Sequence, residues 1–238
     1  MPDNKTKNSF FELFVHLLQM RTSLSSTLRP VYKVSMTQSK PMSLREKNRL
    51  RSRQELLDSV LTLFDEGDLA ACSVEAVAKL VGASKTTVYS YFPGGIDEML
   101  RDVYRLISQR VIALGTQLRD AETETGARIL APARALFSIC AEPKVGRFYM
   151  LLTPALSPLL QPVVGVASGT FKEMFADDLA ASGHDRQSAS LYAVVINGAI
   201  RECAVSVAKC PEQRPDLEKT LAKVIAGIAS MTHYRMIP

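Results

Sequence analysis

The sequence predicts an all-α fold, in which a three-helix head precedes a six-helix body. Along most of the 238 residues, apolar side chains recur every three or four positions, which places them on one face of a helix. No stretch alternates apolar and polar residues long enough to indicate a strand. Glycine, proline and capping residues stand between the periodic stretches, where they end one helix and begin the next.

Composition and length fit one or two globular domains. A domain holds roughly 150 residues, and hydrophobic residues make up 47% of this chain, which is enough for a sizeable core. Tryptophan is absent and aromatic residues make up 7%, so the core must consist mainly of Leu, Val, Ala, Ile and Met. The net charge of +5 is modest, and the positions of the charges matter more than their sum.

The first part of the chain, residues 1–43, is expected to be a flexible extension. An apolar run over 10–18 is similar to the centre of a signal peptide, but polar residues interrupt it and no cleavage site follows. The run is also too short to span a bilayer. Residues 22–40 are rich in Ser, Thr and Pro, which favours a flexible chain. Because Met36 follows shortly before the next domain, residues 1–35 can also be an over-long gene start.

Two short helices joined by one tight turn are predicted between Ser73 and Phe92. The hydroxyl of Ser73 can accept a hydrogen bond from a free amide of the first helix. Gly82 ends that helix, because the residue past a helix C-terminus often needs a positive φ, and Ser84 can cap the second helix. The apolar positions are Val74, Val77, Ala78 and Val81 in the first helix, and Val88, Tyr91 and Phe92 in the second.

This spacing is that of a helix-turn-helix. The small Ala78 lets the two helices approach, Gly82 makes the turn, and Val88 packs the second helix onto the first. The outward side chains of the second helix form a polar, partly basic surface that fits a DNA major groove. These side chains are Lys85, Thr86, Thr87, Tyr89 and Ser90. An ordinary helical hairpin is the alternative interpretation.

A basic segment precedes the helix-turn-helix and predicts contacts with DNA phosphates. Its basic residues are Lys40, Arg45, Lys47, Arg49, Arg51 and Arg53, against a single acid, Glu46. A solvated helix face is the alternative. The candidate DNA-binding residues are Arg45, Lys47, Arg49, Ser73, Ser84, Lys85, Thr86, Thr87, Tyr89, Ser90 and Tyr91. Of these we expect Lys85, Thr86, Tyr89 and Ser90 to reach base edges.

The flanking helices complete the head, predicted over residues 44–95. Upstream, an apolar stripe ends near Gly67, and downstream Pro93-Gly94-Gly95 breaks the chain before Asp97 and Glu98, whose charges suit the start of a helix. The run from about Asn48 to Tyr104 resembles the DNA-binding domain of the TetR family of bacterial regulators. The matching residues are Phe64-Asp65-Glu66-Gly67, Ser73, Val77-Ala78, Val81-Gly82-Ala83-Ser84, Thr87-Val88-Tyr89, Tyr91-Phe92 and Met99-Leu100.

The chain departs from the family pattern at two places. The family often has glycine where this chain has Thr86, and Ser-Lys where this chain has Gly94-Gly95 and one extra residue. The family's lysine contacts a phosphate, and backbone amides at the start of the next helix are the expected replacement here.

The resemblance implies a sequence-specific transcriptional regulator, most often a repressor that a small-molecule effector releases from its operator. It also implies a homodimer on a palindromic operator in double-stranded DNA, without a membrane partner, at the nucleoid of the bacterial cytoplasm. The alternative is an architectural or nucleoid-associated DNA-binding protein without an effector. A thermal-shift screen with small hydrophobic molecules distinguishes the two, because a compound that binds the native state alone raises the melting temperature.

Residues 96–238 are expected to form the effector-binding and dimerisation body. Its helices are predicted over 96–115, 123–141, 144–152, from 158 or 162 to 183, over 186–209, and over 215–233. The last two are apolar almost all round, which requires cover on every side. The resemblance assigns them to a four-helix dimer interface, and a buried core within one chain is the alternative.

No residue pattern indicates catalysis, a metal site or a cofactor. The histidines His16, His184 and His233 lie far apart and are interpreted as surface or capping residues. The cysteines Cys72, Cys140, Cys203 and Cys210 form no Cys-x-x-Cys pair and are expected to be free thiols, with a redox role of Cys72 as the alternative. The chain is therefore not predicted to be an enzyme.

The resemblance implies a cavity between the body helices for an apolar or amphipathic effector. The candidate lining residues are Leu106, Phe137, Cys140, Phe148, Met150, Phe171, Phe175, Tyr192 and Asn197. Asn197 and Arg201 are polar residues on an otherwise apolar helix, and buried polar groups need partners. They can orient a ligand or pair across the dimer.

Overall fold

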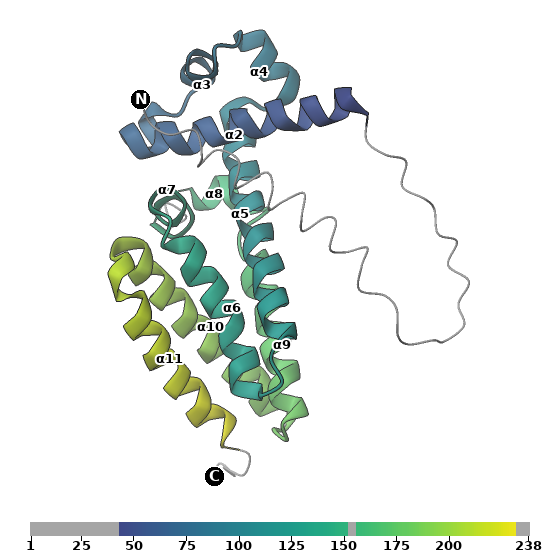
Figure 1. The fold of residues 1–238 in the computed structure, drawn as a ribbon, viewed down its shortest axis with the longest axis vertical. Coiled ribbons are helices and arrows are strands. Elements are labelled where there is room, and N and C mark those ends of the chain that lie inside the picture. Colours follow the sequence, from purple (N-terminus) through teal and green to yellow (C-terminus); the bar gives the residue numbers. More distant parts are fainter. Residues whose placement is uncertain (1–42, 152–155, 232–238) are drawn as a thin grey trace, which may run out of the picture. The chain divides into compact units, whose positions relative to one another are not determined.

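The computed structural model describes residues 43–151 and 156–231, and all regular structure in them is helical (Figure 1). The predicted all-α fold is confirmed. The extension predicted for 1–43, apart from Ser43, and the gene start considered for 1–35 lie outside these residues. Contacts group the chain from Ser43 onward into one unit.

A capping box begins the first described helix, α2 (Leu44–Ala71). The Ser43 amide donates to the Glu46 carboxylate (2.8 Å), and the Ser43 hydroxyl oxygen accepts from the Glu46 amide (3.2 Å). The helical backbone is interrupted at Gly67 and Asp68, where Asp68 has a φ of 58°. The first helix therefore ends where the sequence predicted, and one further turn leads to the helix-turn-helix.

The predicted helix-turn-helix is present as α3 (Val74–Val81) and α4 (Lys85–Tyr91). Gly82 ends α3 with a φ of 70°, a left-handed conformation that glycine adopts without steric cost. Figure 1 shows α3 and α4 beside α2; α3 packs on both α2 and α4, and the three helices share one apolar core.

The body consists of one long helix from the head and shorter helices packed on it. Its α-helices are α5 (Gly95–Asp120), α6 (Thr125–Cys140), α7 (Pro143–Gly146), α8 (Ser157–Leu160), α9 (Val166–Ala181), α10 (Arg186–Lys209) and α11 (Arg214–Ala229). A π-helix, η1 (Arg147–Leu151), follows α7, and a 3-10 turn, η2 (Pro211–Gln213), precedes α11. Helix α5 packs on α2 in the head and on α6 and α9 in the body, so this one helix connects the head to the body.

The described body is more divided than the six predicted helices. The helix predicted to run from 158 or 162 to 183 is two helices, α8 and α9, because Gly165 between them takes a φ of 84°. The helix predicted over 144–152 is α7 followed by η1. The bounds predicted for α10 agree with the structure.

Candidate DNA-binding surface and effector cavity

Helix α4 presents a polar face to solvent because its apolar side is buried. Val88 is fully buried in the core of the head, whereas Lys85, Thr86 and Tyr89 are exposed. Thr86 has no hydrogen bond from its side chain to another described residue. The three exposed side chains can therefore meet a DNA groove without rearrangement of the core.

The serine and threonine hydroxyls predicted to contact DNA also hold the helix ends. Ser73 Oγ accepts from the Ala76 amide (3.1 Å), and Ser84 Oγ accepts from the Thr87 amide (3.0 Å). The Ser84 and Thr87 hydroxyls lie 2.8 Å apart, and Ser90 donates to the Thr87 carbonyl (2.7 Å). The Ser73 and Ser84 hydroxyls are thus fixed at the starts of α3 and α4, where free amides favour anions, whereas Ser90 lies in the last turn of α4.

Lys85, the first residue of α4, forms an ion pair with Glu75 of α3. Both side chains are more than half exposed, at 57% and 59%. The hydrogen bond from Lys85 lowers the pKa of Glu75. The sequence analysis did not identify this partner, which places an acid beside the lysine expected to reach the bases.

The basic residues predicted to precede the helix-turn-helix lie on α2, which begins at Leu44, except for Lys40, which lies outside the described residues. Arg45 and Lys47 are exposed and pair with no other described residue. Arg49 lies over the Tyr91 ring (5.9 Å from the centroid), which connects the basic end of α2 to α4.

The other two arginines of this segment have structural partners. Arg51 pairs with Glu55 (3.1 Å). Arg53 pairs with the buried Asp102 of α5 and lies over the Phe92 ring (4.6 Å from the centroid). Arg53 therefore fastens α2 to α5. Among the described basic residues of this segment, those without an ion-pair partner are the three DNA-binding candidates, Arg45, Lys47 and Arg49.

The start of α5 differs from the expected phosphate site. The Gly94 amide donates to the Glu98 carboxylate (2.8 Å). An acidic side chain of the same helix thus occupies one of the amides that were expected to replace the family's lysine.

A cavity of about 130 Å³ lies between the helices of the body. It is lined by Tyr104, Val111, Leu136, Tyr149, Met150, Val164, Gly165, Ala167, Ser168, Phe171, Phe175, Asn197, Ile200 and Arg201. Four of the nine candidate residues are on this wall, namely Met150, Phe171, Phe175 and Asn197.

The other five candidates lie outside the lining of this cavity. Phe137, Cys140 and Phe148 are fully buried in the core, where neighbouring side chains surround them. Burial raises the pKa of the Cys140 thiol to about 12. Tyr192 packs edge-on against the His184 ring (5.6 Å between centroids), and Leu106 is partly buried against the core.

Two tyrosines that the sequence analysis did not select form one wall of the cavity. The Tyr104 and Tyr149 rings lie 4.7 Å apart, and the Tyr149 hydroxyl lies 3.0 Å from the buried Ser108 hydroxyl. Burial raises the pKa of Tyr149, so the phenol is neutral at pH 7. Tyr104 falls on the apolar face of α5, and this periodicity was the available signal for it.

The π-helix connects the cavity to the head. Tyr149 and Met150 line the cavity, while Arg147, at the other end of the same short helix, pairs with Asp68 at the end of α2. Arg147 also lies over the Phe64 ring (5.2 Å from the centroid) and donates to the Asp65 carbonyl (3.4 Å). The π-helix thus contacts both the cavity and the end of α2.

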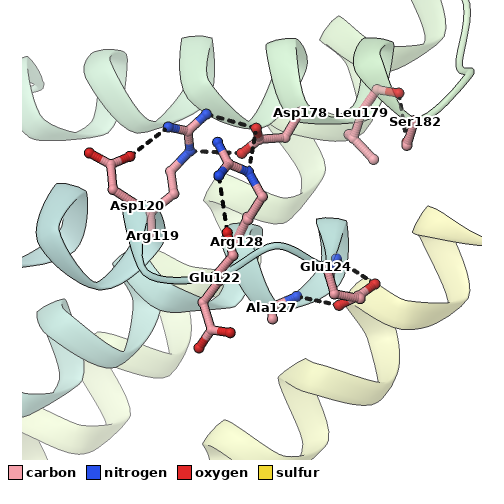
Figure 2. A network of polar contacts seen from close by, with 10 residues as sticks. Arg119, Asp120, Glu122, Glu124, Ala127, Arg128, Asp178, Leu179 and Ser182 are labelled. Carbon is pink, nitrogen blue, oxygen red and sulfur yellow. Dashed lines mark hydrogen bonds and ion pairs between the residues drawn. The ribbon is translucent and has the colours of Figure 1, made fainter. Parts of the chain in front are cut away.

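A buried carboxylate joins three helices at the end of α5 (Figure 2). Asp178 of α9 accepts two hydrogen bonds from Arg119 of α5 (both 2.7 Å) and one from Arg128 of α6 (3.0 Å). Glu124 caps the start of α6 by accepting from two amides. These contacts hold together the three helices whose side chains form much of the cavity wall.

Of the two interpretations of His184, a surface or a capping residue, the structure agrees with the second, because the side chain is buried and lies at the last turns of two helices. Its two ring nitrogens each lie 3.1 Å from a carbonyl oxygen, one of Leu179 and one of Ile228. The histidine thus connects the end of α9 to α11. Within 43–151 and 156–231, no group of three metal-ligating side chains comes together.

Comparisons with known proteins agree with this architecture. Residues 56–103 match the family model described as bacterial regulatory proteins, tetR family. No curated protein matches the chain. A transcriptional regulator from Rhodococcus sp. RHA1 has 21% identity and a TM-score of 0.62, over 74% of this chain and 95% of that one.

Two further solved structures share the fold. A transcriptional regulator from Aquifex aeolicus VF5 has 20% identity and a TM-score of 0.59, over 74% of this chain and 99% of that one. The ketosteroid transcriptional regulator KstR2 of Mycobacterium tuberculosis has 18% identity and a TM-score of 0.54, over 75% and 93%. At these identities the similarity demonstrates a common fold.

Proposed function

We propose that this chain, whose head is the DNA-binding domain of the TetR family of bacterial regulators, is a sequence-specific transcriptional repressor that a small-molecule effector releases from its operator. The observation that carries the proposal is the helix-turn-helix, in which α4 is packed by Val88 and presents Lys85, Thr86 and Tyr89 to solvent. Such a regulator acts in the bacterial cytoplasm, where the DNA lies.

The role of α4 is tested with operator DNA selected from random sequence. Lys85→Ala should weaken operator binding by about 1–3 kcal/mol and relax the preference at one base pair if the lysine contacts a guanine. Glu75→Gln is the matched control, because it removes the partner of Lys85 and leaves the lysine in place. It should leave operator affinity unchanged or raise it. Equal weakening of Lys85→Ala on operator and random DNA would make the lysine a phosphate contact.

The basic end of α2 is tested by salt dependence. Each arginine or lysine on a phosphate contributes roughly 0.9 to the slope of log affinity against log salt. Replacing Arg45, Lys47 and Arg49 together with glutamine should therefore flatten the slope by about two to three without changing the preferred operator. The control replaces three exposed lysines of the body, Lys172, Lys209 and Lys219. An unchanged slope in the α2 variant would mean that this end of the helix is only solvated.

A homodimer through α10 and α11 is supported by apolar side chains that one chain leaves exposed. On α10, Leu191, Val194 and Val195 are 55–60% exposed, and Val224 of α11 is 47% exposed. Among the described helices, α10 alone is long and apolar enough to cross a membrane, and 28% of its most apolar 18-residue stretch is buried within the chain. Single-residue substitution Val195→Glu should convert a dimer to monomer in analytical ultracentrifugation. A chain that is monomeric before substitution and floats with lipid vesicles would contradict the dimer.

Effector release is tested by linkage. If an effector weakens the binding of operator by a certain factor, bound operator must weaken the binding of the effector by the same factor. Effector affinity is therefore measured by calorimetry with and without operator. Equal affinities would contradict effector control and support an architectural DNA-binding protein instead.

A further inference from the structure

The cavity of the body carries a single charge on its described wall. Arg201 of α10 is the only charged residue among the lining residues that the structure describes, and no carboxylate is among them. Most of the remaining lining is aromatic or aliphatic, including Phe171, Phe175 and Met150. A ligand in this cavity therefore meets an apolar surface with one cation at its edge.

Arg201 is exposed and has neither an ion pair nor a hydrogen bond with another described residue. An uncompensated guanidinium matches a planar, two-oxygen anion, because its N–H groups can donate in parallel to both oxygens. Since the residue is exposed, it lies at the mouth of the cavity. A carboxylate bound there keeps part of its hydration and avoids the cost of burying a charge completely.

A second polar pair on the same wall can complete the site. Asn197 Nδ2 donates to Ser168 Oγ (2.7 Å), and both residues line the cavity. The Ser168 hydroxyl accepts this bond, so its own proton can be donated to a ligand, and the Asn197 amide has a second N–H. Two neutral donors therefore accompany the guanidinium.

The volume limits the apolar part of the ligand. A cavity of about 150 Å³ lined by apolar side chains holds one benzene molecule, and this cavity measures about 130 Å³. One ring or a short chain therefore fills the described cavity. The aromatic walls, with Tyr104, Tyr149, Phe171 and Phe175, suit a ring by stacked or edge-on contacts.

We propose that the effector is a small organic monoanion, an aromatic or short aliphatic carboxylic acid, whose apolar part fills the cavity and whose carboxylate binds Arg201. Ser168 and Asn197 donate the remaining hydrogen bonds to the carboxylate. The inference rests on the proposed function only in taking this ligand as the effector. Its binding to the cavity is independent of DNA.

The experiment compares acids with amides of the same shape by isothermal titration calorimetry on the full chain. The pairs are benzoate with benzamide, phenylacetate with phenylacetamide, and hexanoate with hexanamide. The best acid should bind at least about tenfold more tightly than its amide. This ratio corresponds to the lower end of the free energy of hydrogen bonds to a charged group, which we expect because Arg201 is exposed. In Arg201→Gln the acid and the amide should bind within about threefold of each other. Lys209→Gln, which removes an exposed charge from α10 outside the cavity, should keep the preference.

Three results would overturn the inference. In the first, the amides bind as well as the acids. In the second, none of the acids binds. In the third, the Arg201→Gln substitution leaves the preference for acids unchanged and alters the oligomeric state. The last result would place Arg201 at the dimer interface. Because calorimetry needs no operator, these outcomes are separate from the proposed function, which fails when the protein binds no specific DNA. An acid that binds without releasing operator would support the site and contradict effector control.

Discussion

The carboxylate of Asp178 should contribute much more to stability than that of its neighbour Asp177. Asp178 has a side chain 8% exposed and binds Arg119 and Arg128, which are 14% and 26% exposed (Figure 2). Asp177 pairs with Arg186, and both of these side chains are at least 60% exposed. The two aspartates thus provide a matched pair, adjacent in the chain and on one helix.

Asp178→Asn removes the charge and brings amide protons toward two guanidinium groups. Breaking a buried ion pair costs 3–5 kcal/mol, and the partial exposure of the arginines favours the lower end, about 3 kcal/mol. For a chain of this length each kcal/mol lowers the melting temperature by roughly 2–4 °C, so the expected decrease is about 6–12 °C. Asp177→Asn breaks an exposed pair worth about 0–1 kcal/mol, and should lower it by about 4 °C at most.

Differential scanning calorimetry measures both variants at one protein concentration, because dimerisation makes the melting temperature depend on concentration. Both variants should retain operator affinity at 25 °C, since Asp178 of α9 lies beside the C-terminal end of α5, which points away from the head (Figure 1). Equal decreases for the two variants would refute the argument from burial. If Asp178→Asn does not fold, Arg128→Gln takes its place, because it leaves the pair of Asp178 with Arg119 intact. Its melting temperature should still decrease by more than that of Asp177→Asn.

Two further predictions concern η1 and α6. Arg147→Gln should reduce the factor by which effector weakens operator binding while it leaves each separate affinity within about threefold, because the arginine connects the cavity wall to α2; an unchanged factor in fluorescence anisotropy would show that α5 alone transmits the signal. Cys140 should resist iodoacetamide in the folded protein at pH 9, whereas Cys210 is labelled, because burial keeps the Cys140 thiol protonated up to a pKa of about 12. Mass spectrometry after digestion checks this, and rapid labelling of Cys140 would mean that α6 opens locally.

The head could be predicted because its signals are local. Ser73 and Ser84 cap the helices that follow them, and Gly82 takes the positive φ that its position in the turn requires. Each signal depends on residues within one turn of the chain. The bounds of α10 were predicted for the same reason, since Asp185 caps its start and Lys209 closes its last turn.

The ion pairs of the head could not be predicted, because their partners are far apart in sequence. Glu75 is ten residues from Lys85, and Asp102 is 49 residues from Arg53. Neither distance follows a helical period, and only the packing of α3 on α4 and of α2 on α5 brings the groups together. Of the basic segment, the sequence therefore selected Arg45, Lys47 and Arg49 as candidates, but it did not identify Asp102 as the partner of Arg53.

The cavity shows the limit of periodicity most clearly. An apolar pattern predicts which side of a helix faces inward. Phe137 and Phe171 both lie on the inward sides predicted for their helices. Whether the interior beside a residue is filled depends on all of its neighbours. Phe171 passes over Gly115, where a Cβ atom would lie 2.6 Å from its ring, and so reaches the cavity wall. Phe137 is enclosed on every side.

The two sides of α10 pose the same difficulty, and the structure separates them. The helix is apolar almost all round, so sequence alone cannot tell the side facing α9 from the side facing a second copy. Leu191, Val194 and Val195 are exposed, whereas Asn197 and Ile200 line the cavity. Arg201 belongs to the cavity wall while it remains exposed, and so stands at the boundary between the two sides. A ligand bound to Arg201 would therefore lie next to the proposed dimer contact.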